Sequence, residues 1–96
     1  MLFRAYGSAL MPEISRFFGI VIAIFYNDHE PAHFHVRYGA KKARITIDDL
    51  RMLDGDIGAR VRGLVVEWAS QHQDELRQDW ALARIRQPLL PIDPLE

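Results

Sequence analysis

Two short runs of alternating apolar and polar side chains, residues 33–38 and 43–48, constrain the fold of this 96-residue chain more than any other feature. Successive side chains of a β-strand point to opposite faces, so each run predicts a strand with one apolar face. The residues between them contain Gly39 and predict a turn, which makes the two runs a β-hairpin. Keeping the apolar sets on one face predicts these opposed pairs: Tyr38 with Ala43, Val36 with Ile45, Phe34 with Ile47, Arg37 with Arg44, His35 with Thr46, and His33 with Asp48.

The flanking segments complete an α+β domain. Residues 14–26 are rich in Ile, Val and Phe and predict a strand buried on both faces. Residues 56–76 carry apolar side chains at three- and four-residue steps, which predicts an amphipathic helix that either continues to Ala83 or breaks near residues 72–74. The three prolines of residues 87–96 exclude a helix there. We therefore expect a three-stranded, mostly antiparallel sheet followed by a C-terminal helical layer and an extended proline-rich tail.

The first predicted strand is apolar on both sides, whereas the hairpin offers only one apolar face. We therefore expect the tail, the N-terminal extension or a second copy of the chain to cover the second face. A homodimer is expected on this ground. Met11 offers a second start, so residues 1–10 are interpreted as an extension or alternative start and residues 11–96 as a single domain.

Composition excludes several classes of function. The chain has no cysteine, which removes disulfides, thiolate metal ligands and cysteine nucleophiles. Its net charge is −1, so nucleic-acid binding would need a local basic patch. The longest apolar run, residues 19–26, is too short for a membrane helix. The first ten residues lack the apolar segment of a secretory signal, and we expect a cytoplasmic protein that does not contact membranes.

Three of the four histidines, His29, His33 and His35, fall in one short segment. His33 and His35 lie on the same side of a strand, about 7 Å apart along it, a spacing that lets two imidazoles converge on one metal ion. His29 on the preceding loop, or Asp48 across the hairpin, would be a third ligand and would leave an open position, as in catalytic zinc sites. The alternative is structural, with each strand histidine bonded to its partner across the hairpin, Asp48 or Thr46.

The same strand face also suggests an anion site. The predicted register places Arg37 opposite Arg44, a like-charge pair that is easier to understand if a phosphate or a carboxylate sits between them. The alternative is that two solvated arginines splay apart. A histidine beside these arginines could act as general acid or base in RNA cleavage, where no metal is needed. The candidates are therefore His33 and His35 as catalytic residues, Arg37 and Arg44 as anion ligands, and His29, His33 and His35 as an alternative metal set.

Four segments carry a resemblance to a known family: PEISRFFGI at residues 12–20, NDHEPAHFHV at 27–36, VEW at 66–68 and WALA at 80–83. They resemble a bacterial family, domain of unknown function 4160, over residues 11–96. The family pattern includes the three clustered histidines, which the resemblance marks as a candidate site. Members are usually encoded beside a small protein of a second unknown family, 2442, in pairs labelled as toxin–antitoxin modules. The resemblance therefore implies a partner protein from the neighbouring gene and, weakly, an activity directed at RNA.

Three hypotheses for the function follow. The first is a component of a two-gene, toxin–antitoxin-like module that binds a partner protein and acts on RNA through His33 or His35 without a cofactor. The second is a metal-binding domain that holds a divalent ion such as zinc with His29, His33 and His35. The third is a non-catalytic interaction module in which the histidines only organise the turn. The sequence does not decide whether the chain is an enzyme.

Overall fold

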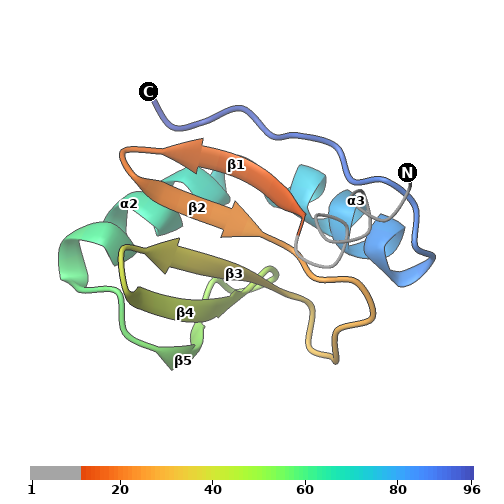
Figure 1. Cartoon of the computed structure of the whole chain (residues 1–96), viewed down its shortest axis with the longest axis horizontal. Helices are drawn as coiled ribbons and strands as arrows, with labels where there is room; N and C mark the ends of the chain where they lie inside the picture. The colour runs from red at the N-terminus through yellow and green to blue at the C-terminus, as the bar shows by residue number, and fades with distance from the viewer. Residues whose placement is uncertain (1–11) are drawn as a thin grey trace.

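Across residues 12–96 the fold is one antiparallel sheet with two helices and a C-terminal strap (Figure 1). A computed structural model describes residues 12–96. Each of the five strands lies beside the next one along the chain, α2 covers one face of the sheet, and α3 lies towards the end where β3 begins. The strands β1 to β5 are Glu13–Phe17, Ile20–Ala23, His33–Tyr38, Lys41–Thr46 and Met52–Gly55, and the helices α2 and α3 are Ala59–Ser70 and Gln73–Arg84.

The α+β class is confirmed, but the prediction of three strands is wrong because the sheet has five. The apolar run of residues 14–26, predicted as one strand, is instead the hairpin of β1 and β2. Phe18 and Gly19 form its turn, with φ angles of 53° and 79°. Two positive φ angles match the twist of paired strands, but Asn and Gly are the usual residues there, so Phe18 hid the turn. β5 was also missed, because its four residues show no alternating apolar pattern.

The predicted hairpin of β3 and β4 is confirmed, but its register differs by two residues. Only Gly39 and Ala40 separate the strands, so Tyr38 lies opposite Lys41. A shift of two residues preserves the faces, and Phe34 and Val36 still point into the core. The pairs His33–Asp48, His35–Thr46 and Arg37–Arg44 are therefore wrong: the structure pairs His33 with Thr46, His35 with Arg44, and Arg37 with Lys42.

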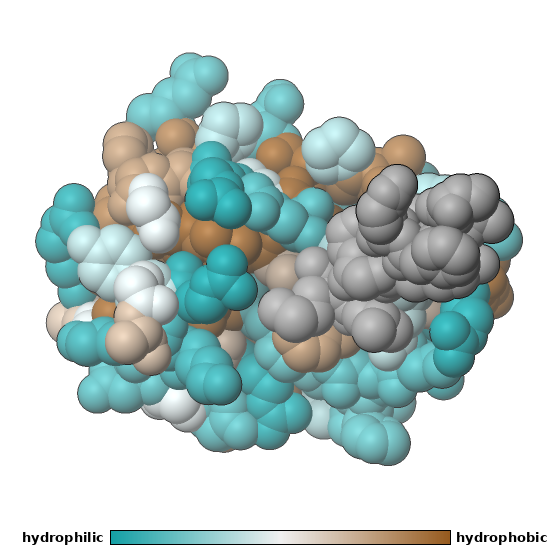
Figure 2. All heavy atoms as spheres, viewed as in Figure 1, coloured by the Kyte–Doolittle hydropathy of each residue, from teal (hydrophilic) through white to brown (hydrophobic). Residues whose placement is uncertain are grey.

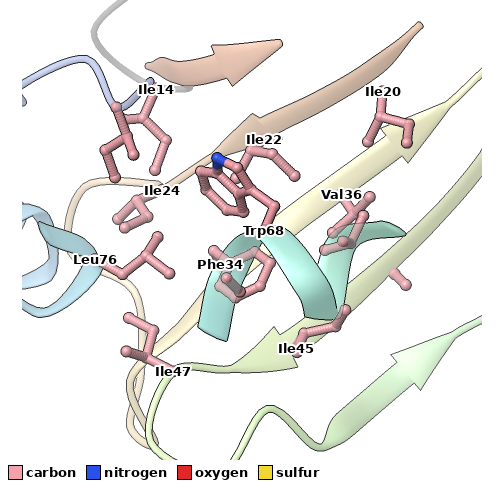
Figure 3. Packing of buried hydrophobic residues seen from close by; sticks show 14 of the residues in the cluster. Ile14, Ile20, Ile22, Ile24, Phe34, Val36, Ile45, Ile47, Trp68 and Leu76 are labelled. Atoms are coloured by element: carbon pink, nitrogen blue, oxygen red, sulfur yellow. The ribbon is translucent and has the colours of Figure 1, made fainter. Parts of the chain in front are cut away.

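The core lies between the sheet and the helices and centres on Trp68 of α2 (Figure 3). The ring of Trp68 packs against Phe17 and Phe34, with ring centroids 5.4 and 6.1 Å apart. The helical region breaks at residues 71–72, as one of the two predicted alternatives had it. Leu76 of α3 belongs to the same cluster. So do six isoleucines that lie on β1, β2 or β4 or one residue beyond β2 or β4: Ile14, Ile20, Ile22, Ile24, Ile45 and Ile47.

The proline-rich tail forms the extended strap that its sequence predicted. The backbone N–H of Ile92 donates a hydrogen bond of 2.8 Å to the carbonyl of Ile14, which places the strap along the edge of β1 (Figure 1). The indole N–H of Trp68 donates to the carbonyl of Asp93 at 2.7 Å. The strap therefore protects an edge strand. It does not cover the face of the sheet opposite α2.

The N-terminal extension, residues 1–10, was the second candidate cover, and it lies outside the described residues. The homodimer and the cytoplasmic location stay predictions. Neither of the helices found in residues 12–96 combines the length and the apolar character that a membrane span requires.

Ile92→Ala should lower the free energy of unfolding by about 2–5 kcal/mol, because the side chain is buried in the core cluster. Leu90→Ala is the matched control in the same strap. Its side chain is 49% exposed, and the change should be below about 1 kcal/mol. Urea denaturation followed by tryptophan fluorescence measures both variants. Equal losses would contradict a strap that is anchored at Ile92.

Asp79 of α3 should make the stability depend on pH. Its Oδ1 accepts a hydrogen bond of 2.8 Å from the backbone N–H of Leu90, and its buried Oδ2 has no partner among the described residues. Burial raises the pKa of Asp79. A carboxyl group whose pKa is raised on folding contributes stability below its unfolded pKa, and this contribution is lost as the pH rises through the folded pKa.

The comparison that isolates this effect is wild type against Asp79→Asn, which cannot titrate. The unfolding free energy of wild type minus that of the variant should fall as the pH rises above about 4, the unfolded pKa of an aspartate. Urea denaturation at stepped pH values measures the difference. A difference that stays constant or rises with pH would show that the carboxyl group is not destabilised by burial.

Candidate functional site

The side chains that could act as acids, bases or metal ligands meet where the loop between β2 and β3 folds back on β3. The Oδ2 atom of Asp28 lies 3.0 Å from Nε2 of His33 and 2.9 Å from Nε2 of His35. The other oxygen, Oδ1, accepts a hydrogen bond of 3.0 Å from the backbone N–H of His29. Nδ1 of His33 lies 2.8 Å from the carbonyl oxygen of Pro31. One carboxylate oxygen therefore faces both strand histidines, and we call Asp28, His33 and His35 the histidine cluster.

The two histidines of the cluster differ in exposure. The side chain of His33 is 1% exposed and packs against Trp80 of α3, with ring centroids 5.3 Å apart. The side chain of His35 is 22% exposed and stacks on Phe25, with centroids 3.7 Å apart and ring planes within 5° of parallel. His33 is therefore an internal anchor, and His35 is the histidine that reaches the surface.

Burial lowers the pKa of His35, and this effect outweighs the hydrogen bond and the negative charge of Asp28, which raise it. Burial acts on Asp28 in the opposite direction and raises its pKa. The hydrogen bonds from His35 and from the His29 backbone, with the charge of His33, nevertheless hold the pKa of Asp28 below its usual value. Near neutral pH the cluster therefore presents a carboxylate and a neutral His35 imidazole.

A groove of about 670 Å³ opens beside His35 on the sheet face opposite α2. This volume is in the range of small-ligand pockets. Its floor is apolar, and the cationic side chains of Arg37 and Lys42 stand along it. Figure 2 shows this face, with hydrophobic atoms in the middle and hydrophilic ones around them. Six of the residues that line the groove are Val21, Ala23, Phe25, His35, Arg37 and Lys42.

The structure brings together two of the three histidines that the sequence singled out. His33 and His35 converge as predicted, but His29 is exposed and contributes only its backbone N–H. The third member is Asp28, which we missed as a ligand because an aspartate before a proline-containing loop is typical of a turn. Asp48, the other predicted third ligand, lies beyond the end of β4 and bonds to Nε of Arg77 at 2.9 Å.

The two candidate anion ligands are also placed differently from the prediction. Arg44 lies opposite His35, and its Nε donates a 3.0 Å hydrogen bond to Asp54 of β5. Arg37 lies opposite Lys42, both are exposed, and no ion pair among the described residues involves either side chain. The predicted like-charge pair of Arg37 and Arg44 is therefore not formed. The like-charge pair in the structure is Arg37 and Lys42.

A family model described as Domain of unknown function (DUF4160) matches residues 19–81. The chain belongs to this family. The matched segment runs from β2 into α3, so the histidine cluster and the groove lie within the DUF4160 domain, whereas β1 and the strap lie outside the match. Searches of curated proteins and of solved structures each gave no match.

Asp28→Ala should lower the free energy of unfolding by about 1–3 kcal/mol, because it leaves the buried Nε2 of His33 without its side-chain partner. His29→Ala is the control in the same loop, and its effect should stay within about 0.5 kcal/mol since the side chain is exposed. Thermal denaturation followed by circular dichroism measures both. A loss in His29→Ala as large as that in Asp28→Ala would contradict the described geometry.

Proposed function

We propose that this DUF4160 domain binds single-stranded RNA in the groove and acts on it through the histidine cluster, as one component of a two-gene, toxin–antitoxin-like module. The observation that carries the proposal is that His35 belongs to both features. Its Nε2 bonds to Asp28, and its side chain lines the groove. A ligand in the groove would therefore lie against the reactive side chains.

The charge along the groove supports a phosphate ligand. Arg37 and Lys42 face each other across β3 and β4, and two like charges at opposed positions destabilise a sheet. A phosphate between them would convert this repulsion into two favourable contacts. Because the net charge of the chain is −1, the attraction is local, and only a few phosphates would be contacted.

The floor of the groove supports a nucleobase beside that phosphate. Val21 and Ala23 are apolar, and Phe25 carries an aromatic ring at the end nearest the histidine cluster. Apolar and aromatic surfaces accept the face of any base, so such contacts tolerate different sequences. Only an unpaired base can lie flat on this floor, which favours single strands over duplexes.

In such a module the neighbouring gene would supply the partner protein, which would inactivate the domain by covering the groove. The strap covers the edge of β1 and leaves this face for a partner. A non-catalytic interaction module would use the same surface, and the contacts of Asp28 with the two histidines would then serve only to hold the loop against β3.

Binding should depend on the two groove cations. With two phosphate contacts, log K for single-stranded RNA should fall with log salt with a slope of about −1.4. Arg37→Ala combined with Lys42→Ala should weaken binding at least about tenfold and bring the slope towards zero. Arg60→Ala combined with Arg62→Ala on α2 removes the same charge from exposed positions that do not line the groove, and should leave binding unchanged.

Fluorescence anisotropy with a labelled RNA oligonucleotide, in excess chelator, measures these affinities. Equal weakening by the two double variants would show that the groove is not the RNA site. Expression without the neighbouring gene should arrest growth, and purified protein should cleave RNA, whereas His35→Ala should do neither. Harmless expression together with intact RNA would exclude an activity directed at RNA.

A further inference from the structure

Both ring nitrogens of His33 face an oxygen atom, and a neutral imidazole has a hydrogen on only one of them. A carbonyl oxygen only accepts hydrogen bonds, so the 2.8 Å contact with Pro31 assigns the hydrogen of the ring to Nδ1. In a neutral imidazole Nε2 then holds a lone pair, and it points at Oδ2 of Asp28, 3.0 Å away. A lone pair and a carboxylate oxygen repel each other at this distance, so a cation belongs between them. It is either a proton on Nε2, which makes the ring an imidazolium that donates to Asp28, or a metal ion that takes the place of that proton.

His35 does not share this problem. No hydrogen bond from a described residue to its Nδ1 fixes the tautomer, so its Nε2 is free either to donate a proton to Asp28 or to offer a lone pair. The cluster therefore has one buried ring whose Nε2 becomes a lone-pair donor once it releases its proton, and one more exposed ring that can adopt the same state. Three electron-pair donors converge on a point inside the cluster.

We propose that Oδ2 of Asp28, Nε2 of His33 and Nε2 of His35 bind one divalent transition-metal ion of the zinc class. The three atoms lie within 4.8 Å of one another. A tetrahedral zinc ion with ligands at about 2.0–2.1 Å holds neighbouring ligand atoms about 3.3 Å apart, so the two nitrogen–oxygen distances need widen by only a few tenths of an ångström. Two imidazoles and one carboxylate suit zinc or iron, whereas Mg²⁺ and Ca²⁺ prefer oxygen ligands alone.

Contacts outside the three donor atoms support the proposal. Histidines that bind metals usually donate their other N–H to a carbonyl or carboxylate, as Nδ1 of His33 does to Pro31. The metal-binding carboxylate is usually hydrogen-bonded as well, and Oδ1 of Asp28 accepts from the His29 backbone. Trp80 and Phe25 pack against the two imidazole rings and restrict their rotation.

The charge around the site permits a bound cation. Arg44 lies opposite His35, and its positive charge would oppose metal binding if it were free. The side chain is held by Asp54, whose Oδ1 accepts from Nε of Arg44 at 3.0 Å and whose Oδ2 accepts from Nη2 at 2.5 Å. The pair is close to neutral, so Arg44 adds little positive charge at the cluster, where Asp28 carries a negative charge.

Three protein ligands leave a position open, and it faces the groove. The side chains of Asp28 and His35 are 16% and 22% exposed, and His35 lines the groove, whereas His33 is sealed inside. Three ligands with one open position are typical of catalytic rather than structural zinc sites. If the proposed function holds, the ion would contact a phosphate oxygen of the bound RNA at this position. Metal binding itself does not rest on the proposed function.

Zinc binding to the full chain, without a histidine tag and after removal of metal with a chelator, tests the proposal in the absence of RNA. Isothermal titration with ZnCl₂ should give one ion per chain with a Kd of about 1 µM or tighter, and MgCl₂ should give no comparable binding. Asp28→Asn and His35→Ala should each weaken binding at least about tenfold. Cobalt should give a visible absorption band that is absent in His35→Ala.

Two further variants separate this site from adventitious binding. His29→Ala removes the exposed histidine of the loop, and His72→Ala removes a histidine that pairs with Glu75 elsewhere in the chain. Both should bind zinc as wild type does. Sub-stoichiometric zinc, binding that persists in folded His35→Ala, or loss of binding in His29→Ala would overturn the proposal. RNA affinity is measured in chelator, so either proposal can fail while the other stands.

Discussion

The carboxylate of Asp28 is the contact on which the arrangement of the site depends. Its two oxygens face the backbone of the β2–β3 loop on one side and both strand histidines on the other. This contact ties the loop to β3 and gives the buried nitrogen of His33 its side-chain neighbour. Because His35 also lines the groove, the same carboxylate sets the position of the histidine cluster at one end of the open sheet face.

Within residues 12–96, the helix α2 and the strap both lie away from that face. The helix α2 and the core around Trp68 occupy one face of the sheet, and the strap pairs with the edge of β1 through Ile92 and Ile14. β1 and the strap lie outside the DUF4160 match and are hydrogen-bonded to each other through Ile92 and Ile14.

The sequence by itself determined those features that depend on local periodicity. Alternation with a period of two assigned Phe34 and Val36 to the core and His33 and His35 to the opposite face, whichever register the strands adopted. The prolines of the tail fixed an extended strap, because proline fits neither a helix nor the interior of a sheet. The break between the two helices was one of two outcomes that the pattern allowed.

The tertiary structure decided the features that periodicity cannot distinguish, which are the strand register, the hidden turn and the path of the loop. A two-residue shift keeps every side chain on its face, so the turn at Gly39 and Ala40, and not the pattern, set Lys42 opposite Arg37. The apolar run before it concealed a turn at Phe18, because Phe18 is itself apolar and lies between the apolar residues of the two strands. Whether Asp28 or its neighbour His29 turned inward depended on the path of the loop over β3, a long-range packing outcome that adjacent residues do not encode.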